Sequence, residues 1–246
     1  FDRINLLLKK NMKNNIDKIK LYFDGPNLDE INIDFGIQID GYTFNPSLFK
    51  KNGATDYIKY SKEVLEKCPN KPVSLEVFAD DENSMINQGK ILNDLGSNVF
   101  VKIPVTYTNG DSTLKVIQNL LNENIKLNIT AIFMIDQIKE LLQTIKDSET
   151  ILSVFAGRIY ECGIDAKKEM KDINKLIKEN SRCQSLWAST RMTYDYIAAK
   201  EVGTDIITMP ISHIEKLKMI GMNPKEYSLK TVKKFYEDAK TSGFKI

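Results

Sequence analysis

A lysine inside an apolar segment is the residue of this sequence that is best placed for covalent chemistry. Residues 98–104 are mostly β-forming residues and end in a proline, which predicts a short strand. Alternate side chains share a face of a strand, so Lys102 lies beside Phe100, and both of its sequence neighbours are apolar. Partial desolvation favours a neutral amine there, which attacks carbonyl carbon and forms a Schiff base. The alternative is a strand-edge lysine whose ammonium lies in water.

Polar side chains also interrupt or follow other apolar segments. Glu76 lies between two apolar residues, where a glutamate is rarely buried without a partner or a function. Asp24 and Asn45 each come just before a turn-forming Gly-Pro or Pro, so turn formation is an alternative role for both. Four further polar residues lie in or just after apolar segments, namely Asn128, Thr130, Ser153 and Ser189. Each could line a site, or could be a small buried polar residue whose side chain hydrogen-bonds to the main chain.

Two arginines follow the ends of predicted strands. Arg158 and Arg191 lie at the face of a parallel sheet where a phosphate would bind, and the guanidinium fork suits phosphate oxygens. Surface ion pairs are the alternative for both. Taken with the lysine, the carboxylates and the hydroxyls, they favour amine–carbonyl chemistry on a phosphorylated sugar.

The elements that must position these residues alternate regularly. Apolar segments predict eight strands, at residues 20–24, 39–44, 73–78, 98–104, 125–132, 151–155, 184–189 and 205–209. Segments with helical periodicity separate them, for example 57–67 and 135–145. Parallel strands need such crossovers, so the sequence predicts an α/β fold, a closed (β/α)8 TIM barrel. An open doubly wound sheet is the alternative, but no Gly-rich phosphate turn follows the first strand.

Strand alternation predicts which side chains face into the barrel. Helices cover the outside, so we expect apolar faces outside and polar faces inside, near the C-terminal strand ends. In the strand at 184–189 this puts Leu186 and Ala188 outside and Ser189 inside.

Three segments are expected along the chain. Residues 1–19 form an N-terminal extension with a helix, and residues 20–222 form the barrel. Residues 223–246 form an amphipathic helix that packs on the barrel bottom or on a neighbouring subunit.

Composition excludes several classes of protein. Lys and Arg number 35 against 33 Asp and Glu, a balance that does not favour nucleic acid as a partner. No run of 18 apolar residues occurs, so no membrane partner is expected. Cys68, Cys162 and Cys183 are scattered, which indicates reduced thiols and a cytoplasmic location. The single histidine, His213, excludes a His-rich metal site.

Seven short motifs together resemble the transaldolase family. They occur in family order over about residues 20–222, at residues 23–24, 43–48, 74–77, 101–104, 127–130, 153–158 and 188–191. The resemblance implies a (β/α)8 barrel of the class I aldolase type. It also implies carbohydrate metabolism with sugar-phosphate substrates, no cofactor and no metal, because a protonated imine serves as the electron sink.

The resemblance implies catalytic roles for four residues. Lys102 would be the Schiff-base nucleophile, and Asp24 would take the hydroxyl proton as the carbon–carbon bond breaks. Glu76 and Thr130 would position and activate the water for imine formation and hydrolysis.

Substrate binding is implied for seven more residues. Three of them, Asn45, Asn128 and Ser153, would hold the hydroxyls of the dihydroxyacetone unit. The phosphate would bind Arg158, Ser189 and Arg191, beside Phe155. Short, ring-forming members of the superfamily place the last helix on a neighbouring subunit, which implies a homo-oligomer.

The choice between related activities depends on a few positions. Fructose-6-phosphate aldolases, which release dihydroxyacetone, typically have glutamine, tyrosine and lysine where Glu76, Phe155 and Arg191 stand. This chain therefore resembles a transaldolase, a transferase of a dihydroxyacetone unit from a ketose phosphate to an aldose phosphate. Phe44 replaces a small residue beside Asn45, which leaves an aldolase or a transaldolase-like enzyme for an unusual sugar as alternatives. A non-catalytic sugar-phosphate-binding barrel is a third interpretation.

Overall fold

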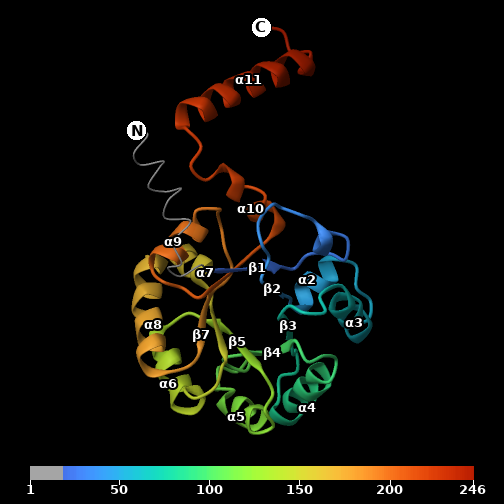
Figure 1. The fold of residues 1–246 in the computed structure, drawn as a ribbon, viewed down its shortest axis with the longest axis vertical. Coiled ribbons are helices and arrows are strands. Elements are labelled where there is room, and N and C mark those ends of the chain that lie inside the picture. The colour runs from blue at the N-terminus through green and yellow to red at the C-terminus, as the bar shows by residue number, and fades with distance from the viewer. Residues whose placement is uncertain (1–18) are drawn as a thin grey trace. The chain divides into compact units, whose positions relative to one another are not determined.

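The computed structural model describes residues 19–246, and these contain a closed barrel of eight parallel strands (Figure 1). The predicted (β/α)8 barrel is therefore confirmed. Each strand pairs with the next, and β8 pairs with β1 through Leu21 and Ile207. The strands are β1 (Lys20–Asp24), β2 (Gly41–Thr43), β3 (Val73–Glu76), β4 (Val99–Pro104), β5 (Leu127–Ile132), β6 (Ile151–Val154), β7 (Gln184–Trp187) and β8 (Ile206–Met209).

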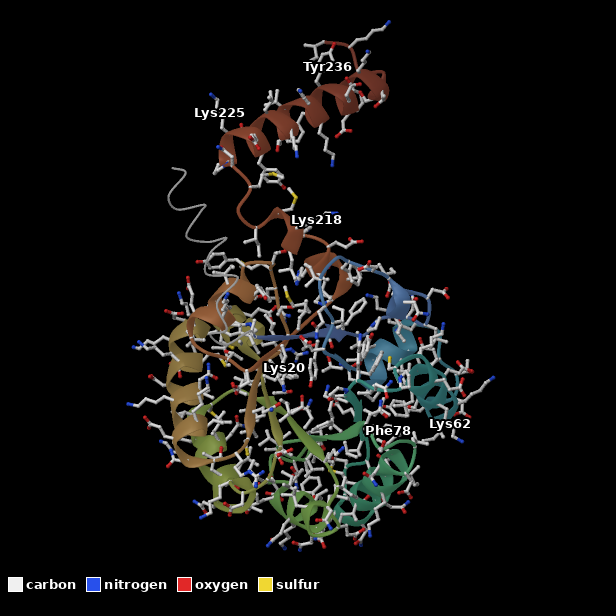
Figure 2. The ribbon with its side chains drawn as sticks, in the orientation of Figure 1. Lys20, Lys62, Phe78, Lys218, Lys225 and Tyr236 are labelled. Atoms are coloured by element: carbon white, nitrogen blue, oxygen red, sulfur yellow. The ribbon has the colours of Figure 1, made fainter. Side chains whose placement is uncertain are left out.

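Helices surround the strands, with charged side chains such as Lys62 directed outward (Figure 2). Several begin at aspartates whose carboxylates accept main-chain N–H groups, among them Asp56 before α3 and Asp81 before α4. The barrel helices are η1 (Glu30–Asn32), α2 (Pro46–Lys51), α3 (Tyr57–Lys67), α4 (Glu82–Asn93), α5 (Leu114–Asn122), α6 (Ile135–Ile145), α7 (Ala156–Glu161), α8 (Ala166–Asn180), α9 (Asp195–Glu201) and α10 (Ile211–Ile214).

Two helices, α2 and α7, were not expected from the sequence. Each has six residues, which is under two turns and too short to show helical periodicity. α2 follows β2 closely because Asn45 caps it, its Oδ1 accepting from Leu48 N at 2.9 Å, with Pro46 in its first turn. Both helices come just after C-terminal strand ends, so they shape the mouth of the barrel.

The floor of the barrel is an apolar cluster. It consists of Tyr22, Ile151, Leu186, Ala188 and Ile206. Gly41 leaves room for it, because a Cβ there would lie 2.6 Å from Tyr22 Cζ. Above this cluster, the C-terminal end of the barrel is lined by polar side chains such as Asp24, Lys102 and Thr130.

The prediction of which β7 side chains point into the barrel was wrong. Leu186 and Ala188 lie inside the barrel, and Trp187 occupies the outer face, 6.2 Å between ring centroids from Tyr160 of α7. The large indole of Trp187 fits between the strand and the helix, and the smaller side chains of Leu186 and Ala188 lie in the barrel interior. Ser189 follows the strand with φ +61°, so strand alternation does not govern its direction.

Residues 216–246 belong to a different compact unit from the barrel. They contain η2 (Leu217–Met219) and α11 (Pro224–Ser242), with Asn223 as the α11 N-cap. α11 buries none of its residues and exposes large apolar side chains, which are Tyr227, Leu229, Val232, Phe235 and Tyr236 (Figure 2). In the described part of the chain, no helix combines the length and apolar character that crossing a bilayer requires. The predicted N-terminal extension lies outside the described residues, apart from Ile19.

Candidate active site

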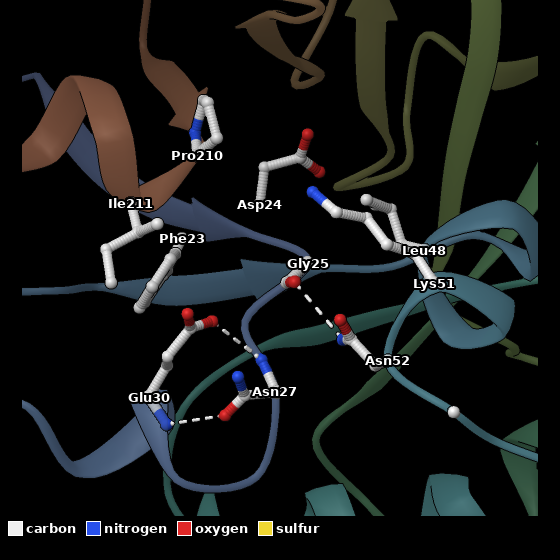
Figure 3. Close-up of a pocket in the computed structure, with 11 residues that line it drawn as sticks. Phe23, Asp24, Gly25, Asn27, Glu30, Leu48, Lys51, Asn52, Pro210 and Ile211 are labelled. Atoms are coloured by element: carbon white, nitrogen blue, oxygen red, sulfur yellow. Dashed lines mark hydrogen bonds between the residues drawn. The ribbon is translucent and has the colours of Figure 1, made fainter.

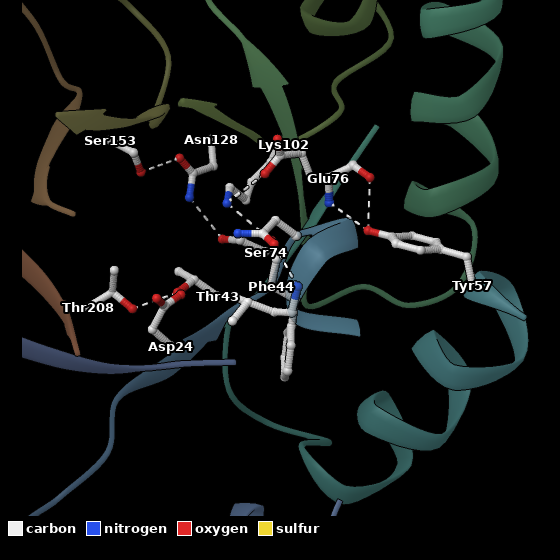
Figure 4. A network of polar contacts seen from close by, with 12 residues as sticks. Asp24, Thr43, Phe44, Tyr57, Ser74, Glu76, Lys102, Asn128, Ser153 and Thr208 are labelled. Atoms are coloured by element: carbon white, nitrogen blue, oxygen red, sulfur yellow. Dashed lines mark hydrogen bonds and ion pairs between the residues drawn. The ribbon is translucent and has the colours of Figure 1, made fainter. Parts of the chain in front are cut away.

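Lys102 lies near the end of β4, inside the barrel, and is only 6% exposed. Its Nζ is 2.9 Å from Glu76 Oε2 and donates to the Phe44 main-chain carbonyl at 3.1 Å (Figure 4). Glu76 stands opposite Lys102 in the β3–β4 register, which brings the two side chains together on one face. The amine therefore has a carboxylate within proton-transfer distance and a fixed carbonyl on another side.

Asp24 ends β1, and its carboxylate accepts a hydrogen bond from one hydroxyl, which a second hydroxyl contacts in turn. Thr43 Oγ1 donates to Asp24 Oδ1 at 2.7 Å and lies 2.6 Å from Thr208 Oγ1 (Figure 4). Burial raises the pKa of Asp24 above its ordinary value, while the bond from Thr43 and the charge of Lys102 oppose this rise. A carboxyl with a raised pKa is suited to accepting and returning a proton near neutral pH.

A small cavity of about 80 Å³ lies between these groups. It is lined by Asp24, Thr43, Asn45, Lys102, Thr130, Ser153, Phe155, Arg158, Ala188, Ser189 and Thr208. The Thr130 hydroxyl is buried, and no hydrogen-bond partner for it exists among the described residues. A buried hydroxyl costs free energy unless it is bonded, so Thr130 is available to a water or a substrate group in the cavity.

Asn128 lies behind the cavity wall. Its Nδ2 donates to Ser74 Oγ at 3.0 Å, and its Oδ1 accepts from Ser153 Oγ at 2.6 Å (Figure 4). Both ends of the amide are thus engaged by neighbours, and Ser153 carries the contact to the cavity.

The residues predicted to bind phosphate lie at two distances from the cavity. Arg158 lines the cavity, with its guanidinium carbon 5.1 Å from the Phe155 ring centroid. Arg191 lies further out, where Nε donates to Glu161 at 2.6 Å and Nη1 donates to Ser189 Oγ at 3.0 Å. Arg158 and Ser189 are therefore the cavity-facing members, and Arg191 fixes Ser189.

A second, larger cavity of about 490 Å³ lies on the other side of Asp24 (Figure 3). Lys51 lines it and points toward Asp24, and Asn52 fixes the turn after β1 by donating to Gly25 O and Pro26 O. Asp24 lines both cavities, so its carboxyl is reached from two sides.

Sequence reasoning missed several groups around the lysine. Thr43 and Thr208 fit the rule that interior polar residues mark the mouth, and strand alternation could have found both. Phe44 contributes its carbonyl only, because its side chain is fully buried against Phe49 at 5.2 Å between centroids. No side-chain pattern predicts such a main-chain contact. Among the described residues, no group of three or more His, Cys, Asp or Glu side chains could hold a metal ion.

Comparison with known proteins shows which family this chain matches. The profile described as transaldolase/fructose-6-phosphate aldolase matches residues 21–246. A probable transaldolase of Thermoplasma volcanium is 34% identical over 212 residues, which is 84% of this chain and 90% of that protein. One from Nitrosopumilus maritimus is 32% identical, covering 81% and 87% respectively.

A solved structure shows the fold alone. The carboxyl transferase domain of Rhizobium etli pyruvate carboxylase has a TM-score of 0.58 at 10% identity, over 80% of this chain and 40% of that one. The family match and the two relatives indicate a barrel enzyme of the transaldolase type. The chain belongs to the transaldolase/fructose-6-phosphate aldolase family.

Proposed function

We propose that this protein is a transaldolase that moves a dihydroxyacetone unit from a ketose phosphate to an aldose phosphate through a Schiff base on Lys102. One observation carries the proposal. The buried Nζ of Lys102 lies 2.9 Å from Glu76 and lines the same cavity as Asp24. Family membership and the probable transaldolase relatives support it.

The first step joins the sugar to the protein. Lys102 gives a proton to Glu76, and its nitrogen attacks the ketose carbonyl carbon to form a carbinolamine. Glu76 returns this proton to the carbinolamine hydroxyl, which leaves as water, and a protonated imine remains. The Thr130 hydroxyl holds the released water. The reverse sequence hydrolyses the imine at the end of the cycle.

The second step breaks the carbon–carbon bond. Asp24 takes the proton from the hydroxyl of the departing half, the aldehyde forms, and the bonding electrons move into the protonated imine to give an enamine. The raised pKa of Asp24 helps the residue to hold this proton until the acceptor aldehyde needs it. Attack of the enamine on the acceptor then reverses the step.

The sugar phosphate would bind at the outer part of the cavity. Arg158 and Ser189 face it, and Arg191 would act with them through its bonds to Ser189. The hydroxyls of the dihydroxyacetone unit would lie near Asn45 and Ser153, with Asn128 fixing the second of these.

The test is imine trapping. Fructose 6-phosphate with borohydride should add one reduced sugar phosphate to Lys102, located by peptide mass spectrometry, and Lys102→Arg should abolish both labelling and turnover. If wild-type protein gains no such mass, the proposal is wrong. A coupled assay with and without a four-carbon aldose phosphate separates transfer from simple aldol cleavage, since an aldolase turns over without the acceptor.

We also propose that the protein is a cytoplasmic homo-oligomer. All three cysteines are free thiols, and α11 exposes a row of large apolar side chains that another copy would cover. Light scattering of Phe235→Lys beside wild type tests the assembly. A mass that stays at that of one chain in the wild type contradicts it and favours packing on the helix's own barrel.

A further inference from the structure

The hydrogen-bond ladder between β2 and β3 stops just below the candidate catalytic pair. The last rung joins the Phe44 N–H to the Ser74 carbonyl at 2.9 Å. In a continuing parallel ladder, the Glu76 N–H would donate to the Phe44 carbonyl, and the N–H of residue 46 would donate to the Glu76 carbonyl. Residue 46 is a proline without an N–H, and the chain turns into α2 there. Two rungs are therefore missing at Glu76.

One hydroxyl replaces both rungs. Tyr57 Oη accepts from the Glu76 N–H at 3.1 Å and donates to the Glu76 carbonyl at 2.8 Å (Figure 4). The Phe44 carbonyl is thereby left for Lys102, whose Nζ donates to it at 3.1 Å. Tyr57 thus supports both partners of the catalytic amine without touching it.

Tyr57 is itself held firmly. It is the first residue of α3, directly after the Asp56 N-cap. Its ring lies 4.7 Å from the Phe49 centroid and 5.3 Å from the Phe78 centroid. Burial raises the pKa of Tyr57 well above its ordinary value, so the hydroxyl keeps the proton that it donates.

We propose that Tyr57 is a positioning residue for imine chemistry: its hydroxyl substitutes for the two missing β-rungs and thereby fixes the Glu76 carboxylate and the Phe44 carbonyl around Lys102. The inference rests on the proposed function for its biological meaning. The arrangement of Glu76 and the Phe44 carbonyl around Lys102 can nevertheless be tested by the reactivity of the lysine, without a sugar.

The central test compares Tyr57→Phe with Tyr60→Phe. Both tyrosines are on α3 and pack on Phe49, but the Tyr60 hydroxyl has Asn52 and Leu28 as neighbours instead of Glu76. We expect Tyr57→Phe to lower the rate of imine trapping and kcat roughly tenfold, the effect of about one hydrogen bond. KM for the ketose phosphate should stay within about twofold, because the phosphate groups are untouched. Equal rates in Tyr57→Phe, Tyr60→Phe and wild type would overturn the inference.

A double-mutant cycle separates positioning from a general loss of structure. In a Glu76→Gln background, Tyr57→Phe should lower the trapping rate less than threefold, because the carboxylate that it positions is already gone. The same tenfold loss in both backgrounds would overturn the inference, since it would reflect a weakened fold.

Two readouts do not depend on the sugar. Reductive methylation of Lys102 by formaldehyde should slow several-fold in Tyr57→Phe and stay unchanged in Tyr60→Phe. In the wild type, the Glu76 amide should resist hydrogen exchange as strongly as the Leu75 amide inside the strand. Free exchange at Glu76, or equal methylation in all three proteins, would overturn the positioning role. If the wild type traps no ketose phosphate, the proposed function fails, and these two readouts still decide the role of Tyr57.

Discussion

Gly157, the second residue of α7, lies very close to the main chain after β7 at the mouth of the barrel. A Cβ added there would lie 1.7 Å from the Ser189 carbonyl oxygen and 3.1 Å from Arg191 Cγ. Its N–H donates to the Ala188 carbonyl at 3.4 Å, so the start of α7 and the chain after β7 are pressed together. We predict that Gly157→Ala displaces the candidate phosphate-binding residues.

The loss of stability can be estimated from the overlap between the added Cβ and the Ser189 carbonyl oxygen. An ordinary Cβ contact begins near 3.4 Å, so the two segments must separate by on the order of 1.5 Å. The obstructing atom belongs to the main chain and cannot rotate away, which places the cost near the upper end of the overpacking range, about 3 kcal/mol. Alanine recovers roughly 1 kcal/mol through its helix propensity. The net loss of about 2 kcal/mol corresponds to roughly 4–8 °C in Tm for a chain of this size.

The assay is thermal unfolding combined with steady-state kinetics. Because a shift of about 1 Å in a positioning group can cost roughly 100-fold in rate, we expect kcat/KM for the ketose phosphate to fall by at least tenfold. Gly163→Ala is the matched control, since Gly163 has φ +75° and no atom within 4 Å of the added Cβ. That variant should lose about 1–2 kcal/mol from left-handed strain with unchanged kinetics. Gly157→Ala with wild-type Tm and kinetics would refute the reasoning.

Three further predictions concern the barrel interior and the acid–base group. Asp24→Asn should abolish turnover yet raise the free energy of unfolding at pH 7. The carboxyl has a higher pKa folded than unfolded, so wild type loses stability as pH rises from 3.8 through the raised value. Denaturant melts at pH 4 and pH 8 should show a larger gain for the variant at pH 8, and equal gains would contradict this. Lys51→Met should raise the pKa of Asp24 further and move the acidic limb of the kcat profile to higher pH, whereas Lys50→Met on the same helix should not. A limb at the wild-type position in Lys51→Met would count against the electrostatic effect. Leu186→Ala should cost about 2–5 kcal/mol in chemical denaturation because it opens a void in the barrel floor, and a loss below about 1 kcal/mol would argue against its interior position.

The sequence predicted the elements whose patterns are long and regular. Strand β1 and helix α3 have the predicted ends, and α6 contains the apolar residues that were expected on a helix there, because apolar periodicity over a full helix or strand is a strong local signal. The lysine, both carboxylates and the hydroxyls of Thr130 and Ser153 come together as strand alternation predicts. Local sequence patterns were therefore sufficient to predict the barrel and many of the side chains at its C-terminal end.

The unpredicted parts depend on contacts between distant segments. Trp187 takes the outer face of β7 because of space beside α7, and this tertiary fit reverses the facing of Leu186. Ser189 reaches the cavity through a left-handed backbone that serine rarely adopts. The Tyr57 hydroxyl replaces rungs that the turn at Pro46 removes, and no spacing in the sequence records that exchange.

The carbonyl of Phe44 has a consequence for how this site can vary. The lysine is anchored to an atom that every amino acid carries, so no single substitution at position 44 deletes the contact. Exchange of the buried ring would alter packing against Phe49 while the anchoring oxygen stays in place. Substitutions at this position can therefore change the thermal stability of the protein while the carbonyl contact of Lys102 is kept.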